Sequence, residues 1–320
     1  MLSRNTIERV LTAALSRSGD FAEIYIEKTL TNGLAAINGK IEQADFGLDF
    51  GVGIRIFLGI RSVYVYANSF DENTLVQIAK DASASLPSSE LVLPSFHFDV
   101  KKYQSQIARV RSSTVENSEM AELLHHSCRH ARDYSQKITQ TSASCSGIER
   151  SICIANTDGL YVEDERARSR FAVQAVASSG TEKQTGHLSP GSGKGFEYIQ
   201  SLDIKSLSEE AARIAATMID ARPCPSGSFP VIIGNGFGGV IFHETCGHSL
   251  ESTSVGIKAS VFADRLGEKI ASDCVSAVDD PTIEGEWGSF KVDDEGVAPK
   301  RNILIDKGVL KGYMIDRLGQ

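Results

Sequence analysis

The residues with the clearest chemical potential lie in one short segment, FHETCGHSLE, at positions 242–251. It contains His243, Glu244 and His248 in the spacing H-E-x-x-x-H. Two neutral imidazoles can hold a zinc ion, which lowers the pKa of a bound water toward about 7. An adjacent carboxylate can take the proton of that water and pass it to a leaving amine. The pattern predicts zinc-dependent hydrolysis, with the histidines as ligands and Glu244 as general base.

The spacing of the two histidines makes a demand on the backbone. Residues five apart on a regular α-helix point about 140° away from each other, so these rings converge only if the helix bends, bulges or ends. Gly247 directly precedes His248 and tolerates left-handed or irregular backbone. We therefore expect Gly247 to distort the helix. Glu251 is either the acceptor that orients the His248 ring or a solvated carboxylate at a helix end.

The motif alone leaves other interpretations open. Two histidines on an apolar helix also occur without metal, as polar groups satisfied by hydrogen bonds. Cys246 is a possible further ligand, but a ligand within the same turn would strain a tetrahedral site, and a buried thiol is the commoner outcome. The glycines at 234, 236 and 239 form G-x-G-x-x-G. No βαβ series precedes them, which favours a tight turn over a cofactor-binding dinucleotide site.

Two units of mixed helix and strand precede the motif. Residues 1–85 begin with an amphipathic helix, continue as a strand meander over 21–67 and end in a helix near 71–84. Residues 112–222 contain a helix at 114–133, three strand-like runs, a Gly/Ser-rich loop at 181–198 and a helix at 207–221. Two Pro-containing segments, 86–95 and 222–227, mark the boundaries.

The last unit, residues 228–320, carries the motif. It opens with the strand-like run FPVIIG, enters the site through the metal-binding helix and ends in a hairpin that turns at Asp306-Lys307-Gly308. Cys274 lies in a further strand-like run and is expected in the core. The chain is thus expected to be α+β, with a mostly β catalytic unit.

Composition restricts the functional class. The 320 residues are 41% hydrophobic and carry a net charge of −8. A nucleic-acid binder needs a basic stripe, and none is present. No run approaches the roughly 18 apolar residues of a membrane span. The six cysteines are scattered and no signal peptide is evident, which predicts reduced thiols in a cytoplasmic protein.

Several separated segments resemble the TldD/PmbA family, in the order that family has them. They are FHETCGHSLE, FADRLGEKIAS, VDDPTIEGEWGSFKVDDEG and NILIDKGVLKGYMIDRL. The two upstream units are similar to the family's first and central domains in arrangement. Because PmbA-type subunits lack H-E-x-x-x-H, the chain resembles the TldD side. The resemblance implies zinc on His243 and His248, with Glu244 as base, and a dimer with a PmbA-type partner or a second copy.

The resemblance also implies a third zinc ligand, a cysteine beyond the matched hairpin. None of the six cysteines occupies that position, so we expect a C-terminally truncated member with an incomplete site. Hydrolysis of unfolded or extended peptides is the function implied. The alternatives are an inactive subunit that binds peptide or partner, and a regulator of DNA gyrase, which the acidic charge disfavours.

Overall fold

The computed structural model describes residues 2–87 and 96–319, so most of the boundary expected at 86–95 lies outside the described residues. The chain forms two compact units: Met1–Arg222 with Glu284–Gly296, and Pro223–Ile283 with Val297–Gln320. The segment 284–296, placed in the last unit by the sequence, therefore groups with the first. The three domains expected from the sequence remain a prediction.

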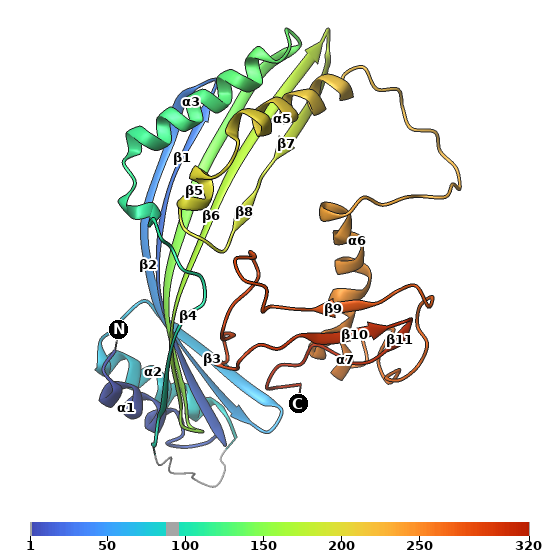
Figure 1. Cartoon of the computed structure of the whole chain (residues 1–320). Coiled ribbons are helices and arrows are strands. Elements are labelled where there is room, and N and C mark those ends of the chain that lie inside the picture. Colours follow the sequence, from blue (N-terminus) through green and yellow to red (C-terminus); the bar gives the residue numbers. More distant parts are fainter. Residues whose placement is uncertain (1, 88–95, 320) are drawn as a thin grey trace. The chain divides into compact units, whose positions relative to one another are not determined.

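The first unit is built on one long mixed sheet (Figure 1). Its strand order is β3-β2-β1-β5-β6-β4, and β7 and β8 also pair with β6. The β4–β6 pair is parallel and the other pairs are antiparallel. The strands are β1 (Phe21–Ile37), β2 (Lys40–Leu58), β3 (Arg61–Ala67), β4 (Asp99–Gln104), β5 (Ile138–Asn156), β6 (Leu160–Ser179), β7 (Glu182–Leu188) and β8 (Gly191–Ser192).

Several of these strands are longer than the sequence pattern predicts. β1 runs unbroken for 17 residues, through Gly33. A Cβ on Gly33 would lie 2.8 Å from the Cys145 carbonyl oxygen, so this glycine permits close approach of β5. The prediction of a loop at 181–198 is wrong: half of the segment pairs with β6 as β7 and β8, and the short helix α4 (Glu197–Gln200) follows.

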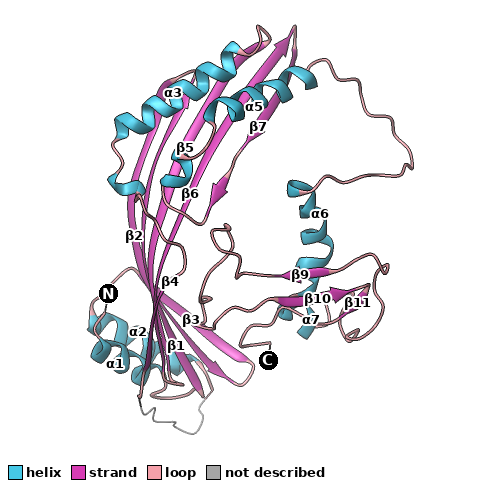
Figure 2. Cartoon of the chain, in the orientation of Figure 1, coloured by secondary structure: helices cyan, strands magenta, loops and turns pink. Residues whose placement is uncertain are grey.

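Two pairs of helices cover opposite ends of the sheet, as Figure 2 shows. Ser3 and Asp71 cap the first pair by accepting from backbone N–H groups. Isoleucines 24 and 26 of β1 lie in the core beneath that pair, and Leu34 and Ala36 in the core beneath the other. All four positions are even, so both pairs cover one face of β1. The helices are α1 (Arg4–Ala14), α2 (Glu72–Ser85), α3 (Asn117–Asp133) and α5 (Ile204–Met218).

The segment 284–296 packs on the other face of β6. Arg166 donates to the Asp294 carboxylate and the Val292 carbonyl, both at the end of this segment. The Trp287 ring lies beneath the guanidinium groups of Arg168 and Arg170, at 5.3 and 4.5 Å. This packing explains the grouping of 284–296 with the first unit.

The second unit has a small sheet, ordered β11-β10-β9, around a core that includes Leu250, Leu304 and Leu310. The hairpin predicted at 306–308 is confirmed: Asp306 pairs with Val309, and the two turn residues have φ of 45° and 80°. These values suit a type I′ turn. The strands are β9 (Ala277–Asp279), β10 (Asn302–Asp306) and β11 (Val309–Leu310).

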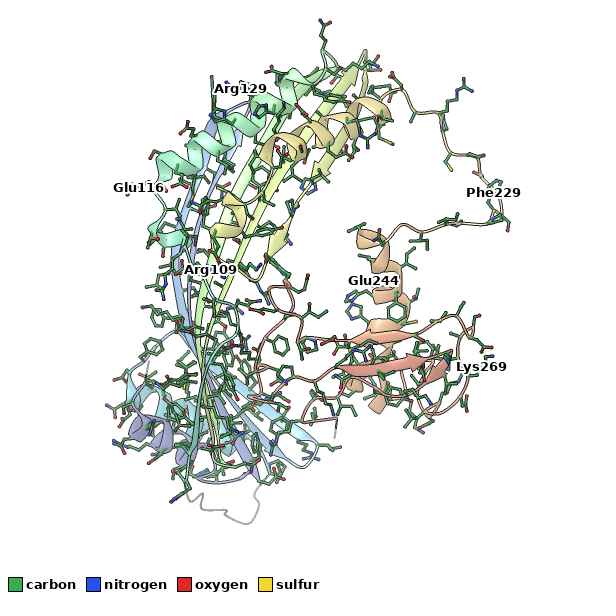
Figure 3. The ribbon with its side chains drawn as sticks, in the orientation of Figure 1. Arg109, Glu116, Arg129, Phe229, Glu244 and Lys269 are labelled. Carbon is green, nitrogen blue, oxygen red and sulfur yellow. The ribbon has the colours of Figure 1, made fainter. Side chains whose placement is uncertain are left out.

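The prediction of a strand at FPVIIG is wrong. Residues 229–234 form no strand, and Ile232 is 98% exposed. No partner strand meets this segment in the described part of the chain, and without a partner an apolar run forms no ladder. Phe229 marks the extended segment in Figure 3. The α+β class is confirmed, and no described helix is long and apolar enough to cross a membrane.

Candidate metal centre

The H-E-x-x-x-H motif lies on an irregular helical segment of the second unit, where Glu244 is labelled in Figure 3. The segment changes its helix type four times. It consists of the 3₁₀-helix η2 (Gly236–Gly239), α6 (Val240–Phe242), the π-helix η3 (His243–Gly247) and the 3₁₀-helix η4 (His248–Leu250), followed by α7 (Ser252–Gly256). The glycines at 236 and 239 lie within the opening turn, as the sequence favoured.

A single π turn brings the two histidines together. The backbone N–H of His248 donates to the carbonyl of His243, five residues earlier. A π turn closes over five residues where an α turn closes over four, so the two side chains return to the same side. The ring centroids lie 4.4 Å apart, with planes inclined by 70°. Ligand atoms of His243, Glu244 and His248 all lie within 4.8 Å of one another.

Gly247 ends the π turn but does so in right-handed helical conformation, with φ −53° and ψ −64°. The left-handed geometry that glycine would permit is therefore not used. A Cβ at this position would lie 3.6 Å from Nδ1 of His243, which is ordinary van der Waals contact. The bulge thus comes from the hydrogen-bond pattern, and the small size of Gly247 leaves space beside the His243 ring.

Glu251 lies against the second histidine. One of its carboxylate oxygens is 2.9 Å from Nδ1 of His248. A carboxylate bonded to one ring nitrogen orients the imidazole and leaves the other nitrogen, Nε2, available to a metal. The backbone of Glu251 forms an isolated β-bridge with Met314, near the C-terminal end of the same unit. The backbone around this residue is therefore anchored.

No cysteine of the described residues belongs to the cluster of His243, Glu244 and His248. Cys246 is half-buried and packs against the core of the second unit, and among the described residues the cluster consists of His243, Glu244 and His248. The expectation that Cys274 is buried is wrong. Its thiol is exposed and lies 3.3 Å from the Ser272 hydroxyl.

The donor set fits a zinc ion. Imidazole nitrogens are ligands that zinc takes, and those of His243 and His248 converge on one point of the helical segment, beside the Glu244 carboxylate. All three side chains are exposed, so solvent and substrate can reach them. The Glu244 carboxylate lies within 4.8 Å of the ligand atoms of both imidazoles.

Known domain families cover most of the chain. Residues 22–86 match the PmbA/TldA metallopeptidase domain 1, residues 111–219 the central domain and residues 226–319 the C-terminal domain. The side-chain cluster of His243, Glu244 and His248 lies within the match to the C-terminal domain.

Similar proteins occur in bacteria and archaea. A metalloprotease TldD homolog of Haemophilus influenzae is 30% identical over 99% of this chain and 67% of its own length. A metalloprotease of Methanocaldococcus jannaschii is 31% identical over 99% of this chain and 69% of its own length. This chain thus spans about two thirds of the length of such relatives.

Solved structures share the fold at low sequence identity. A putative modulator of DNA gyrase from Bacteroides thetaiotaomicron superposes with a TM-score of 0.81, at 16% identity, over 100% of this chain and 74% of that one. TldE from Thermococcus kodakarensis gives 0.71 at 18% identity, over 98% of this chain and 70% of that one.

Proposed function

Because the chain belongs to the TldD/PmbA metallopeptidase family, we propose that it is a TldD-type zinc peptidase that hydrolyses unfolded or extended peptides. The observation that carries the proposal is the convergence of His243, Glu244 and His248 at a π turn. A five-residue spacing on a regular helix would separate the rings. The π turn brings together the groups that hydrolysis requires.

Each side chain has a separate task. The imidazoles of His243 and His248 hold the ion through neutral nitrogens, and Glu251 keeps the second ring oriented. Zinc held there would polarise a water and act as a Lewis acid toward the oxygen of the peptide carbonyl. Glu244 accepts the proton of the attacking water and returns it to the amine that leaves. A third protein ligand is expected to be a cysteine outside the matched hairpin, as the family resemblance implies.

The partner and the compartment are part of the same proposal. We propose that the chain works in a dimer, with a PmbA-type subunit or a second copy. The presence of TldE among the structural neighbours supports this proposal. All six thiols are free, which supports a reducing, cytoplasmic location. The alternative is a subunit that binds peptide or partner without cutting.

The test combines metal content with hydrolysis of an unstructured peptide. Glu244→Gln is expected to keep zinc and to lose turnover by about 10²-fold or more, because the base is removed and the ligands remain. His243→Ala and His248→Ala are expected to lose zinc and turnover together. His187→Ala, an exposed histidine on β7, is the control and should change neither.

One result would contradict the assigned base, and another would favour the alternative function. Near-full turnover in Glu244→Gln would show that the assigned base is wrong. Stoichiometric zinc with no hydrolysis by the unaltered chain, alone or with its PmbA-type partner, would favour the non-catalytic subunit.

A further inference from the structure

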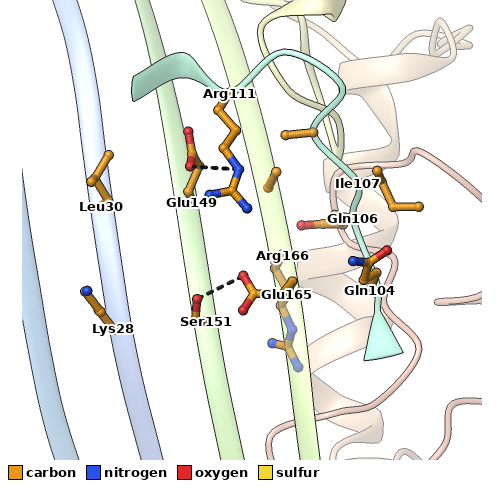
Figure 4. Close-up of a pocket in the computed structure, with 12 residues that line it drawn as sticks. Lys28, Leu30, Gln104, Gln106, Ile107, Arg111, Glu149, Ser151, Glu165 and Arg166 are labelled. Atoms are coloured by element: carbon orange, nitrogen blue, oxygen red, sulfur yellow. Dashed lines mark hydrogen bonds and ion pairs between the residues drawn. The ribbon is translucent and has the colours of Figure 1, made fainter. Parts of the chain in front are cut away.

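A hollow of about 210 Å³ lies on the sheet of the first unit (Figure 4). Its floor is formed by the middle of β1, β5 and β6, and one wall by the segment that follows β4. Water occupies about 30 Å³ per molecule in the liquid, so this space equals about seven waters. Drug-sized ligands occupy sites of about 300–1,000 Å³. The hollow therefore suits a smaller molecule.

Cross-strand register arranges opposite charges on this floor. Lys28 lies opposite Ser151, and Ser151 opposite Glu165, so the three residues form one rung across β1, β5 and β6. The next rung consists of Leu30, Glu149 and Ala167. Strands lie about 4.8 Å apart, which separates the backbones of Lys28 and Glu165 by about 10 Å. A cation and an anion therefore flank a partly apolar centre.

These two charges are available to a ligand. The Lys28 side chain is exposed, and its ammonium makes no ion pair with the residues that the structure describes. Glu165 accepts a hydrogen bond from Ser151 and is otherwise exposed. Glu149 differs, because Ser113 donates to it at 3.0 Å and Arg111 lies beside it.

Gln106 adds a buried acceptor to the wall. It is 4% exposed, and its Nε2 donates to the carbonyls of Ser289 and Trp287 at 3.0 and 3.3 Å. A flipped amide would place its oxygen against two carbonyl oxygens, so the orientation is determined. Oε1 has no donor among the described residues and is itself out of solvent contact, so Gln106 holds the wall in place and does not contact a ligand in the hollow. Figure 4 shows this side chain projecting from the segment after β4 toward β6.

We propose that the hollow binds a dipeptide-sized zwitterion. Its ammonium would donate to the Glu165 carboxylate, and its carboxylate would pair with the Lys28 ammonium. An extended dipeptide is about 7 Å long, which fits between side chains that start about 10 Å apart. Leu30 and Ile107 supply apolar contact for its side chain. All these residues belong to the first unit, so the inference is independent of the proposed metal centre.

The experiment titrates glycyl-leucine into the whole chain after metal removal with EDTA, so that the histidine cluster cannot hold the peptide through zinc. Binding is followed by calorimetry and by amide chemical shifts. We expect saturable binding that is weakened about tenfold or more by Lys28→Gln and by Glu165→Gln, because each removes one charged partner. Lys80→Gln, an exposed lysine on α2, should leave the affinity unchanged.

Blocked peptides test the chemistry of recognition. N-acetylation or C-terminal amidation of glycyl-leucine should each reduce affinity to a similar extent, because each removes one charge. Equal binding of the blocked and free dipeptides would overturn the proposal. So would an absence of saturable binding up to about 10 mM, a concentration that detects even weak complexes. Thermal unfolding of each variant checks that the substituted chain is folded.

Discussion

His248 donates its backbone N–H to the carbonyl of His243, and this one π-type hydrogen bond brings the two imidazole rings to 4.4 Å. Single π turns inside helices occur often at functional sites. Here the turn resolves the conflict between a five-residue spacing and the period of 3.6 residues. The geometry of the His243, Glu244 and His248 cluster therefore depends on the backbone hydrogen-bond pattern as well as on the residue types.

The contact between Glu251 and His248 predicts a measurable effect on metal affinity. Glu251→Gln should weaken zinc binding by about 10–100-fold, because the ring loses the carboxylate that orients it. Asp273→Asn, at a carboxylate that is 77% exposed and pairs with Lys269, is the control. Competition with a chromogenic chelator measures both affinities. Equal losses in the two variants would point to a general charge effect instead.

Gly247 predicts a dependence on side-chain size. Gly247→Ala should retain zinc affinity, since its Cβ would stand at ordinary contact distance from the His243 ring. Gly247→Val should reduce that affinity, because its branched side chain is stiff in helices and reaches further toward the imidazole. The same chelator competition tests both. Identical affinities for alanine and valine would show that space beside the ring is not required.

Arg166 predicts how strongly the segment 284–296 is held. Its side chain is 9% exposed and pairs with Asp164, which is 0% exposed, and with Asp294. Arg166→Met should cost about 3–5 kcal/mol in unfolding free energy, because it leaves the Asp164 charge buried with one partner fewer. Urea unfolding measures the loss, and proteolysis within 284–296 should accelerate.

Arg170→Met is the matched control for this substitution. Arg170 is exposed and contacts the Trp287 ring at 4.5 Å, so its loss should cost only about 0.5–1 kcal/mol. Similar losses for the two arginines would mean that burial of the Arg166–Asp164 pair does not matter.

Glu197 predicts a pH-dependent part of stability. Burial by itself would raise the pKa of this carboxyl, but backbone N–H groups of Val110, Arg109 and Gly195 hold the pKa below its usual 4.5. A depressed carboxyl pKa stabilises the folded chain above about pH 4.5, and this stabilisation disappears as the pH falls through the lower folded value.

Glu197→Gln should therefore lower the unfolding free energy by about 1–2 kcal/mol at pH 7, and by less at about pH 3.5. Urea titrations at both pH values measure the difference. Glu182→Gln, an exposed carboxylate on β7, should have no effect at either pH. A loss that is the same at both pH values would contradict the assigned role of the charge.

The sequence by itself determined the features that depend on neighbouring residues. Apolar spacing predicted the buried face of α1, which includes Ile7, Val10 and Leu11. The helix expected near 71–84 is α2 (Glu72–Ser85), and Lys307-Gly308 predicted the hairpin. The motif of His243 and its neighbours, together with the need for a distorted helix, was also visible. Each of these signals lies within one or two turns of chain.

Only the tertiary structure decided which segments meet. Residues 182–188 form a strand because β6 offers them an edge, whereas 229–234 have no such partner among the described residues. The segment 284–296 joins the first unit through Arg166, more than a hundred positions away in the chain. The rung of Lys28, Ser151 and Glu165 exists only once three strands take one register. Pairing and register depend on distant residues, and no local pattern of side chains encodes them.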